Sequence, residues 1–121
     1  MLLSVAAIVL ESLDPSRLAA WYRRHFAFVL DLEHEGGVFG TFETADGGFR
    51  FGLKPFLATP DAPKLRSVAL TFRVDDIEAM IAHLQQEGLA PDVNRSTEGE
   101  SYASVRDPEE NIITLWGSSS P

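Results

Sequence analysis

The stretch Ser67-Val-Ala-Leu-Thr-Phe-Arg-Val-Asp-Asp76 decides the fold of this chain. Its apolar side chains recur at every second position: Val68, Leu70, Phe72 and Val74. This alternation is the pattern of a strand that buries one face. Two aspartates follow, and a carboxylate at such a point can cap a helix. The stretch therefore predicts a half-buried strand that leads directly into a helix.

An earlier stretch repeats this pattern at an offset of 62 residues (69 − 7 = 62). Val5-Ala-Ala-Ile-Val-Leu-Glu-Ser-Leu-Asp14 aligns with Ser67–Asp76, so that Ala7 pairs with Ala69 and Asp14 with Asp76. A short unit that occurs twice indicates two copies of one small module.

The first half of the chain predicts one helix and four strands. Asp14 can cap the helix and Pro15 can occupy its first position, where the missing N–H costs nothing. The helix is expected to end near Phe26, with Trp21 and Tyr22 in the core between helix and sheet. The strands are expected over residues 3–10, 29–35, 38–44 and 49–53, with a hairpin turn at Asp46-Gly47-Gly48.

The second half repeats this order after residues 55–64, which contain three prolines and predict a linker. The expected strands cover residues 68–74, 91–94, 102–106 and 112–116, with a polar loop at 96–99 and a frayed tail at 118–121. The expected helix has Ile77, Met80, Ile81 and Leu84 on one face. Asp75 and Glu78 have the spacing of a capping box, and Gly88 suits the C-terminal end. Each half is therefore β-α-β-β-β, and we expect a single domain of two modules, about 3–54 and 65–117.

The amino-acid composition excludes several classes of binding partner and of chemistry. A net charge of −8 argues against nucleic acid and gives no support for an anionic membrane surface. The absence of cysteine excludes disulfides and thiolate chemistry. The apolar beginning of the chain lacks a basic leading segment and is interrupted by Glu11, and no run approaches the roughly 18 apolar residues of a membrane span. We expect a cytoplasmic protein.

Three motifs carry a resemblance to a known family. They are Asp14 followed by Trp21-Tyr22, Phe72-Arg-Val-Asp-Asp76, and Asp107-Pro-Glu-Glu-Asn-Ile-Ile-Thr-Leu115. In this order, and with the repeat, the chain resembles the vicinal oxygen chelate superfamily, which includes glyoxalase I, extradiol dioxygenases, and fosfomycin- and bleomycin-resistance proteins. One departure is Glu110, where the family commonly has glycine, so the turn is either of another type or holds a left-handed residue.

The resemblance implies an α+β fold. Two β-α-β-β-β modules would form a U-shaped eight-stranded mixed sheet around a cavity, with the helices on the convex side. It also implies a homodimer, with or without exchange of modules. Two ferredoxin-like halves are the alternative fold.

The resemblance also implies where a metal would lie. Enzymes of this family place His, Gln or Glu ligands at one inward position on each of four strands, and those positions are here Ala7, Gly52, Ala69 and Thr114. Three of these residues have no ligating side chain, and a neutral threonine hydroxyl is a poor ligand for divalent metals. We therefore expect no metal, no cofactor and no catalytic residue at these positions.

Period-2 alternation then gives the residues that share a face with these positions and would line the cavity. They are Val9, Glu11, Arg50, Gly52, Lys54, Thr71, Arg73, Ile112, Thr114 and Trp116. Arg50, Lys54 and Arg73 could bind an anionic group, whereas the acidic total charge favours a cationic ligand. Alternatively, these charges face water or pair with acids, and Trp116 fills the cavity or a subunit contact.

The histidines give no joint site from sequence alone. His25 and His83 fall on the two expected helices, and His34 lies between Glu33 and Glu35, where a relocated metal site is a weaker alternative. The favoured function is metal-free binding of a small molecule for sequestration or carriage, as in bleomycin-resistance proteins. The alternatives are a lyase, isomerase or dioxygenase with non-standard metal ligands, and an interaction or regulatory module without a small ligand.

Overall fold

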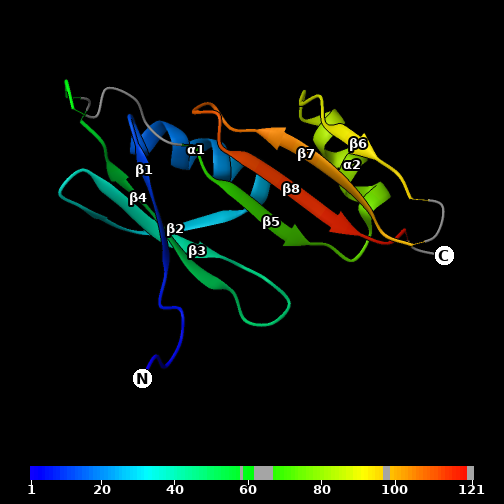
Figure 1. The fold of residues 1–121 in the computed structure, drawn as a ribbon, viewed down its shortest axis with the longest axis horizontal. Coiled ribbons are helices and arrows are strands. Elements are labelled where there is room, and N and C mark those ends of the chain that lie inside the picture. Colours follow the sequence, from blue (N-terminus) through cyan, green and yellow to red (C-terminus); the bar gives the residue numbers. More distant parts are fainter. Residues whose placement is uncertain (58, 62–66, 97–98, 120–121) are drawn as a thin grey trace. The chain divides into compact units, whose positions relative to one another are not determined.

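The computed structural model describes residues 1–57, 59–61, 67–96 and 99–119. The chain divides into two compact units, residues 1–66 and 67–121. Each unit is a β-α-β-β-β module with its own four-stranded mixed sheet and its own packed helix, as the sequence predicts (Figure 1). The ferredoxin-like alternative is wrong, because neither half has a second helix among the described residues. The joining of the two sheets into one U-shaped sheet, and of the two units into one domain, stays a prediction.

Module 1 contains the first five elements of the chain. They are β1 (Ile8–Ser12), α1 (Pro15–Phe26), β2 (Phe28–His34), β3 (Gly37–Phe42) and β4 (Phe49–Pro55). The strand order is β1-β4-β3-β2, with β1 parallel to β4 and the other pairs antiparallel. Helix α1 contacts β2, β3 and β4, so one face of the sheet is covered.

Aromatic side chains form the core of module 1. Tyr22 of α1 is fully buried and meets Phe42 and Phe51 edge-on, and Phe28 packs on the same two rings. Offset and edge-on ring pairs of this kind stabilise beyond the area that they bury. The expected cap is confirmed, since the Asp14 carboxylate accepts a hydrogen bond from Arg17 N at 3.2 Å.

Module 2 repeats the architecture with an aliphatic core. Its elements are β5 (Ala69–Arg73), α2 (Ile77–Gln86), β6 (Asp92–Asn94), β7 (Ser101–Arg106) and β8 (Ile112–Gly117), in the sheet order β5-β8-β7-β6. Helix α2 buries Ile77, Ile81 and Leu84 and contacts β7 and β8. Gly88 ends the helix as expected: its φ is +81°, and Leu89 N donates to Leu84 O at 3.0 Å, the bond of a Schellman motif.

The strand register reproduces the repeat seen in the sequence. Val9 lies beside Gly52 in module 1, and Thr71 lies beside Thr114 in module 2, so both pairs differ by 62 residues (71 − 9 = 62; 114 − 52 = 62). The third strand of each module departs from this offset. Phe39 faces Gly52 whereas Ser104 faces Thr114, an offset of 65 (104 − 39 = 65).

The expected first strand is wrong at its beginning. Residues 1–7 lie outside any strand, and Leu3 is 92% exposed. In module 2 the turn before β8 holds the start of β5, because Asn111 Oδ1 accepts from Val68 N at 2.8 Å and Ile112 N donates to Val68 O at 2.8 Å. At the position equivalent to Asn111, module 1 has Phe49, which offers no side-chain acceptor, and pairing begins only at Ile8.

The expected capping box is also wrong. Asp76, not Asp75, is the cap of α2, since its carboxylate accepts from Ala79 N at 3.2 Å. Glu78 turns instead to Arg95 beyond β6 and accepts two hydrogen bonds from it, at 2.7 and 2.9 Å. The hydrogen bond from Arg95 is the main cause of the lowered pKa of Glu78. Glu78 therefore stabilises the folded state at pH values above the ordinary pKa of a glutamate. This contribution is lost as the pH falls through the lowered pKa of the folded state.

The expected linker and tail begin later than the sequence indicates. Strand β4 extends to Pro55, and Phe56 N donates to Ser12 O at 2.8 Å, so both residues belong to module 1. Ser118 O accepts from Ile77 N at 3.1 Å, so the tail is held at its first residue. Residues 58 and 62–64 of the linker, 97–98 of the polar loop and 120–121 of the tail lie outside the described residues.

The turn before β8 holds a left-handed residue, as one of the two sequence-based alternatives predicts. Glu110 has φ +69° at the position where glycine is expected. Because a left-handed non-glycine residue costs about 1–2 kcal/mol, Glu110→Gly should raise the free energy of unfolding by about 1 kcal/mol. The substitution removes only an exposed ion pair to Arg106 at 3.4 Å, which stabilises little. Chemical denaturation with Glu109→Gly as the control tests this, and a Glu110→Gly protein no more stable than the parent would contradict it.

Candidate functional site

Each sheet has one face covered by its helix and one that we call the open face, on the opposite side. The residues that the sequence places in the cavity lie on these open faces, in two groups. Module 1 carries Val9, Glu11, Arg50, Gly52 and Lys54, and module 2 carries Thr71, Arg73, Ile112, Thr114 and Trp116. Ala7 lies just before β1, and Ala69 is the first residue of β5.

The central row of the open face in module 1 is apolar. Val9, Gly52, Phe39 and Leu32 stand side by side on the four strands. The Phe39 ring lies over two glycines: a Cβ at Gly52 would come within 2.6 Å of Phe39 Cε1, and one at Gly37 within 2.9 Å of Cε2. The position that a metal ligand would need in module 1 is therefore covered by an aromatic ring.

The corresponding row in module 2 is polar. Thr71, Thr114, Ser104 and Asp92 stand side by side across the sheet, and we call them the polar row. Ser104 Oγ and Thr114 Oγ1 are 3.0 Å apart and share a hydrogen bond. Ser104 occupies the position that Phe39 holds in module 1, so this row stays uncovered by an aromatic ring. It offers three neutral hydroxyls and one carboxylate to a ligand.

These donors do not fit the metal that enzymes of the family hold. Divalent transition metals prefer several imidazole, carboxylate or thiolate ligands, and the polar row has only one such group. Nowhere in the described part of the chain do three histidine, aspartate or glutamate side chains come together. His25 lies buried on α1, His83 lies on α2, and His34 is exposed near Glu35 at 3.9 Å. The arrangement supports binding of a ligand by hydrogen bonds.

A second row beside the polar row is aromatic. Arg73, Trp116, Tyr102 and Asn94 stand side by side, and we call them the aromatic row. Arg73 lies over the Trp116 ring, 4.8 Å from its centroid, and Asn94 Nδ2 donates to the Tyr102 hydroxyl at 2.9 Å. Trp116 is 39% exposed and Tyr102 is 43% exposed. Each ring therefore remains accessible although a polar neighbour contacts it. Accessible, fixed rings of this kind can stack on a planar ligand.

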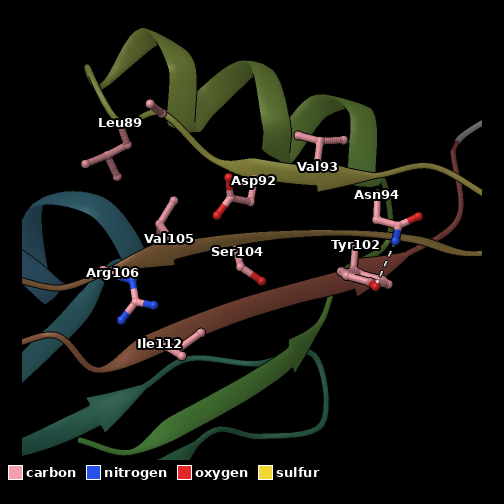
Figure 2. A pocket seen from close by; sticks show the side chains of 10 residues that line it. Leu89, Asp92, Val93, Asn94, Tyr102, Ser104, Val105, Arg106 and Ile112 are labelled. Atoms are coloured by element: carbon pink, nitrogen blue, oxygen red, sulfur yellow. Dashed lines mark hydrogen bonds between the residues drawn. The ribbon is translucent and has the colours of Figure 1, made fainter.

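A cavity of about 630 Å³ lies along β6 and β7 of module 2, lined by residues of both sheet faces. Asp92, Asn94, Tyr102, Ser104, Arg106 and Ile112 line it from the sheet, together with Leu89, Ala90, Val93 and Val105. Figure 2 shows the first six along β6, β7 and β8, with the Asn94–Tyr102 hydrogen bond dashed. The volume falls within the range typical of small-molecule sites, about 300–1,000 Å³.

Two of the three cations that could bind an anion, Arg50 and Arg73, are paired with carboxylates. Arg50 donates two hydrogen bonds to Asp31, at 2.7 and 3.2 Å, and these raise the pKa of Arg50. Arg73 donates to Glu100 at 2.7 Å, and Lys54 stands beside Glu11 in the strand register. Asp31 reaches Arg50 because the register of β2 shifts at that residue. The alternative in which these charges pair with acids is therefore correct for both arginines.

Sequence reasoning missed the contribution of β6 and β7. Asp92, Asn94, Tyr102, Ser104 and Arg106 line the cavity but lie on strands that carry no metal position in the family. The sequence contains a signal for the three on β7, because Tyr102, Ser104 and Arg106 alternate with the apolar Ala103 and Val105. In the structure Ala103 and Val105 are buried and face the core. Extending the period-2 rule from four strands to all eight would have found them.

Comparison with known proteins identifies the family to which this fold belongs. Residues 5–115 match the model of the Glyoxalase/Bleomycin resistance protein/Dioxygenase superfamily. The chain belongs to this superfamily, so the resemblance to the vicinal oxygen chelate proteins is confirmed. A search of curated proteins found no match.

Solved structures match over nearly the whole chain. The antibiotic-binding protein TnmS3 from Streptomyces sp. CB03234 has a TM-score of 0.74 at 24% identity, covering 98% of each chain. A glyoxalase/bleomycin resistance protein from the same organism has a TM-score of 0.68 at 25% identity, covering 93% of this chain and 98% of that one. Lactoylglutathione lyase from Agrobacterium tumefaciens has a TM-score of 0.71 at 15% identity, covering 93% and 92%. At these identities the similarity shows the fold.

The described helices are too short or too polar to cross a membrane.

Proposed function

We propose that this protein binds a small organic molecule without metal chemistry, on the open face of module 2, to sequester or carry it. One observation carries the proposal: around Thr114, one of the positions where enzymes of the superfamily hold metal ligands, module 2 has a hydrogen-bonding row beside two accessible aromatic rings. Mixed surfaces of this kind, concave and with a few well-placed polar groups, are typical of small-molecule sites.

Two further observations support a binding role. TnmS3, whose fold this chain shares, is described as an antibiotic-binding protein. In module 1 the Phe39 ring lies over Gly52, which favours a site built by module 2 over two equivalent metal half-sites. The homodimer implied by the resemblance belongs to the same proposal, and light scattering of the purified protein would measure it.

A thermal-shift screen with bleomycin and a panel of aromatic small molecules tests the proposal, followed by calorimetric titration of each hit. We expect Trp116→Ala and Tyr102→Ala to weaken binding of a hit by about fivefold each, since stacking on an aromatic ring is worth about 1 kcal/mol. Leu57→Ala is the control, because Leu57 is 84% exposed and belongs to module 1.

Two results would overturn the proposal. One is a panel in which no compound stabilises the protein. The other is stoichiometric zinc, manganese, nickel or iron in the purified protein by elemental analysis, which would favour the metal-dependent enzyme instead.

A further inference from the structure

We propose, building on the proposed binding function, that the ligand is an aromatic cation. Its ring would lie on Tyr102 and Trp116, and its protonated amine would meet the Asp92 carboxylate. The inference names the ligand class and goes beyond binding as such.

The first argument is the balance of charge on the open face of module 2. Arg73 is paired with Glu100 at 2.7 Å, and Arg106 with Glu110 at 3.4 Å. Within the described ranges, no arginine, lysine or histidine lies within ion-pair distance of Asp92. Asp92 therefore contributes the uncompensated charge of this cavity, and it is negative.

The second argument is the surroundings of Asp92. Ser104 is its register partner on β7 and shares its hydroxyl with Thr114, so neutral oxygen atoms continue the row beside the carboxylate. An ammonium group has three donors and no acceptor, and it can use both the carboxylate and these hydroxyls. Arg106 also lines the cavity, but it is paired with Glu110, so an anionic group would have to replace Glu110 and would also face Asp92.

The third argument is the distance between the two rows. Asn94 and Tyr102 are register partners, as are Asp92 and Ser104, so the rows are two residues apart along the strands. At about 3.4 Å per residue this corresponds to roughly 7 Å. An amine carried one or two bonds from a bicyclic or linked ring system spans this distance. The net charge of −8 also attracts a cation over long range.

Ligands that share one ring system and differ in charge test the inference. We would titrate naphthalene, quinoline and biphenyl compounds that carry an aminomethyl, hydroxymethyl or carboxylate group, by calorimetry and ligand-observed NMR. The parent protein is expected to bind the amine of a series at least about tenfold more tightly than the alcohol, since a hydrogen bond to a charged group is worth about 1.5–3 kcal/mol. The carboxylate is expected to bind most weakly.

Asp92→Asn and Glu33→Gln separate the local charge from the total charge, because each removes one negative charge. Glu33 lies exposed on β2 in module 1 and serves as the matched control. Asp92→Asn should weaken the amine about tenfold and leave the alcohol unchanged, so that the preference for the amine disappears. Glu33→Gln should preserve the preference.

The outcomes distinguish this inference from the proposed function. Binding without charge preference, a preference for the carboxylate, or an amine preference that survives Asp92→Asn would overturn the aromatic cation and leave binding intact. The absence of any binding, in this series and in the broader panel, would overturn both.

Discussion

Asn111→Ala should lower the free energy of unfolding by about 3 kcal/mol, because it removes one buried and one partly buried hydrogen bond and leaves their polar partners short of a contact. Asn111 is 1% exposed. Its Oδ1 accepts from Val68 N at 2.8 Å, and its Nδ2 donates to Asp107 Oδ2 at 2.8 Å. The side chain thus joins the start of β5 to the turn that begins β8, and the two strands lie parallel in the sheet.

Asp107 makes this loss larger than that of an ordinary hydrogen bond. Its carboxylate is 3% exposed and also accepts from Glu109 N at 2.8 Å and Asn111 N at 3.0 Å. Without the Asn111 amide, a buried carboxylate loses one of its donors, and an unsatisfied charged group costs more than a neutral one.

Urea denaturation of Asn111→Ala and of Asn94→Ala measures the difference. Asn94 also donates a side-chain hydrogen bond, to the Tyr102 hydroxyl at 2.9 Å, but it is exposed, so Asn94→Ala should change stability by less than about 0.5 kcal/mol. Similar losses for both variants would show that burial of the Asn111 network does not govern stability.

The same network explains where the sequence-based repeat succeeds and where it fails. The alternating apolar residues predict β5 and β1 equally well, and the offset of 62 correctly pairs Val9 with Gly52 and Thr71 with Thr114. Only module 2 has an asparagine that binds the start of its first strand. Alternation reports which face of a strand is buried, but it carries no information on whether a neighbouring strand is present.

The sequence predicts on which face of the sheet the site residues lie, but it does not predict which side chains they contact. Period 2 places Arg50 and Arg73 on the open faces, yet their carboxylate partners are 19 and 27 residues away in sequence. Asp31 reaches Arg50 through a register shift, which has no signature in the amino-acid pattern. The pairing of both arginines could not be predicted for this reason, whereas Asp92 could have been found by applying period 2 to the sixth strand.

Gly52→Ala should lower the free energy of unfolding by about 2 kcal/mol, although glycine-to-alanine changes elsewhere in strands are usually favourable. A Cβ at this position would come within 2.6 Å of Phe39 Cε1, so the ring must move off the sheet or the strands must separate. Because the obstacle is a side chain, shortening it should remove the penalty. We expect Gly52→Ala to cost less than about 0.5 kcal/mol in a Phe39→Ala background, a coupling of about 1.5 kcal/mol or more between the two positions.

Gly40 and Gly99 are the matched controls for this double-mutant cycle. A Cβ at Gly40 would overlap the backbone oxygen of Val29, so Gly40→Ala should be destabilising even when neighbouring side chains are truncated. Gly99 has no atom within 4 Å of the same position, so Gly99→Ala should be close to neutral. Additive effects of Gly52→Ala and Phe39→Ala would contradict the covering of the metal position by Phe39. Strong coupling would mean that a histidine or glutamate ligand at residue 52 requires a smaller residue at 39 as well, so a metal site here needs at least two changes in module 1.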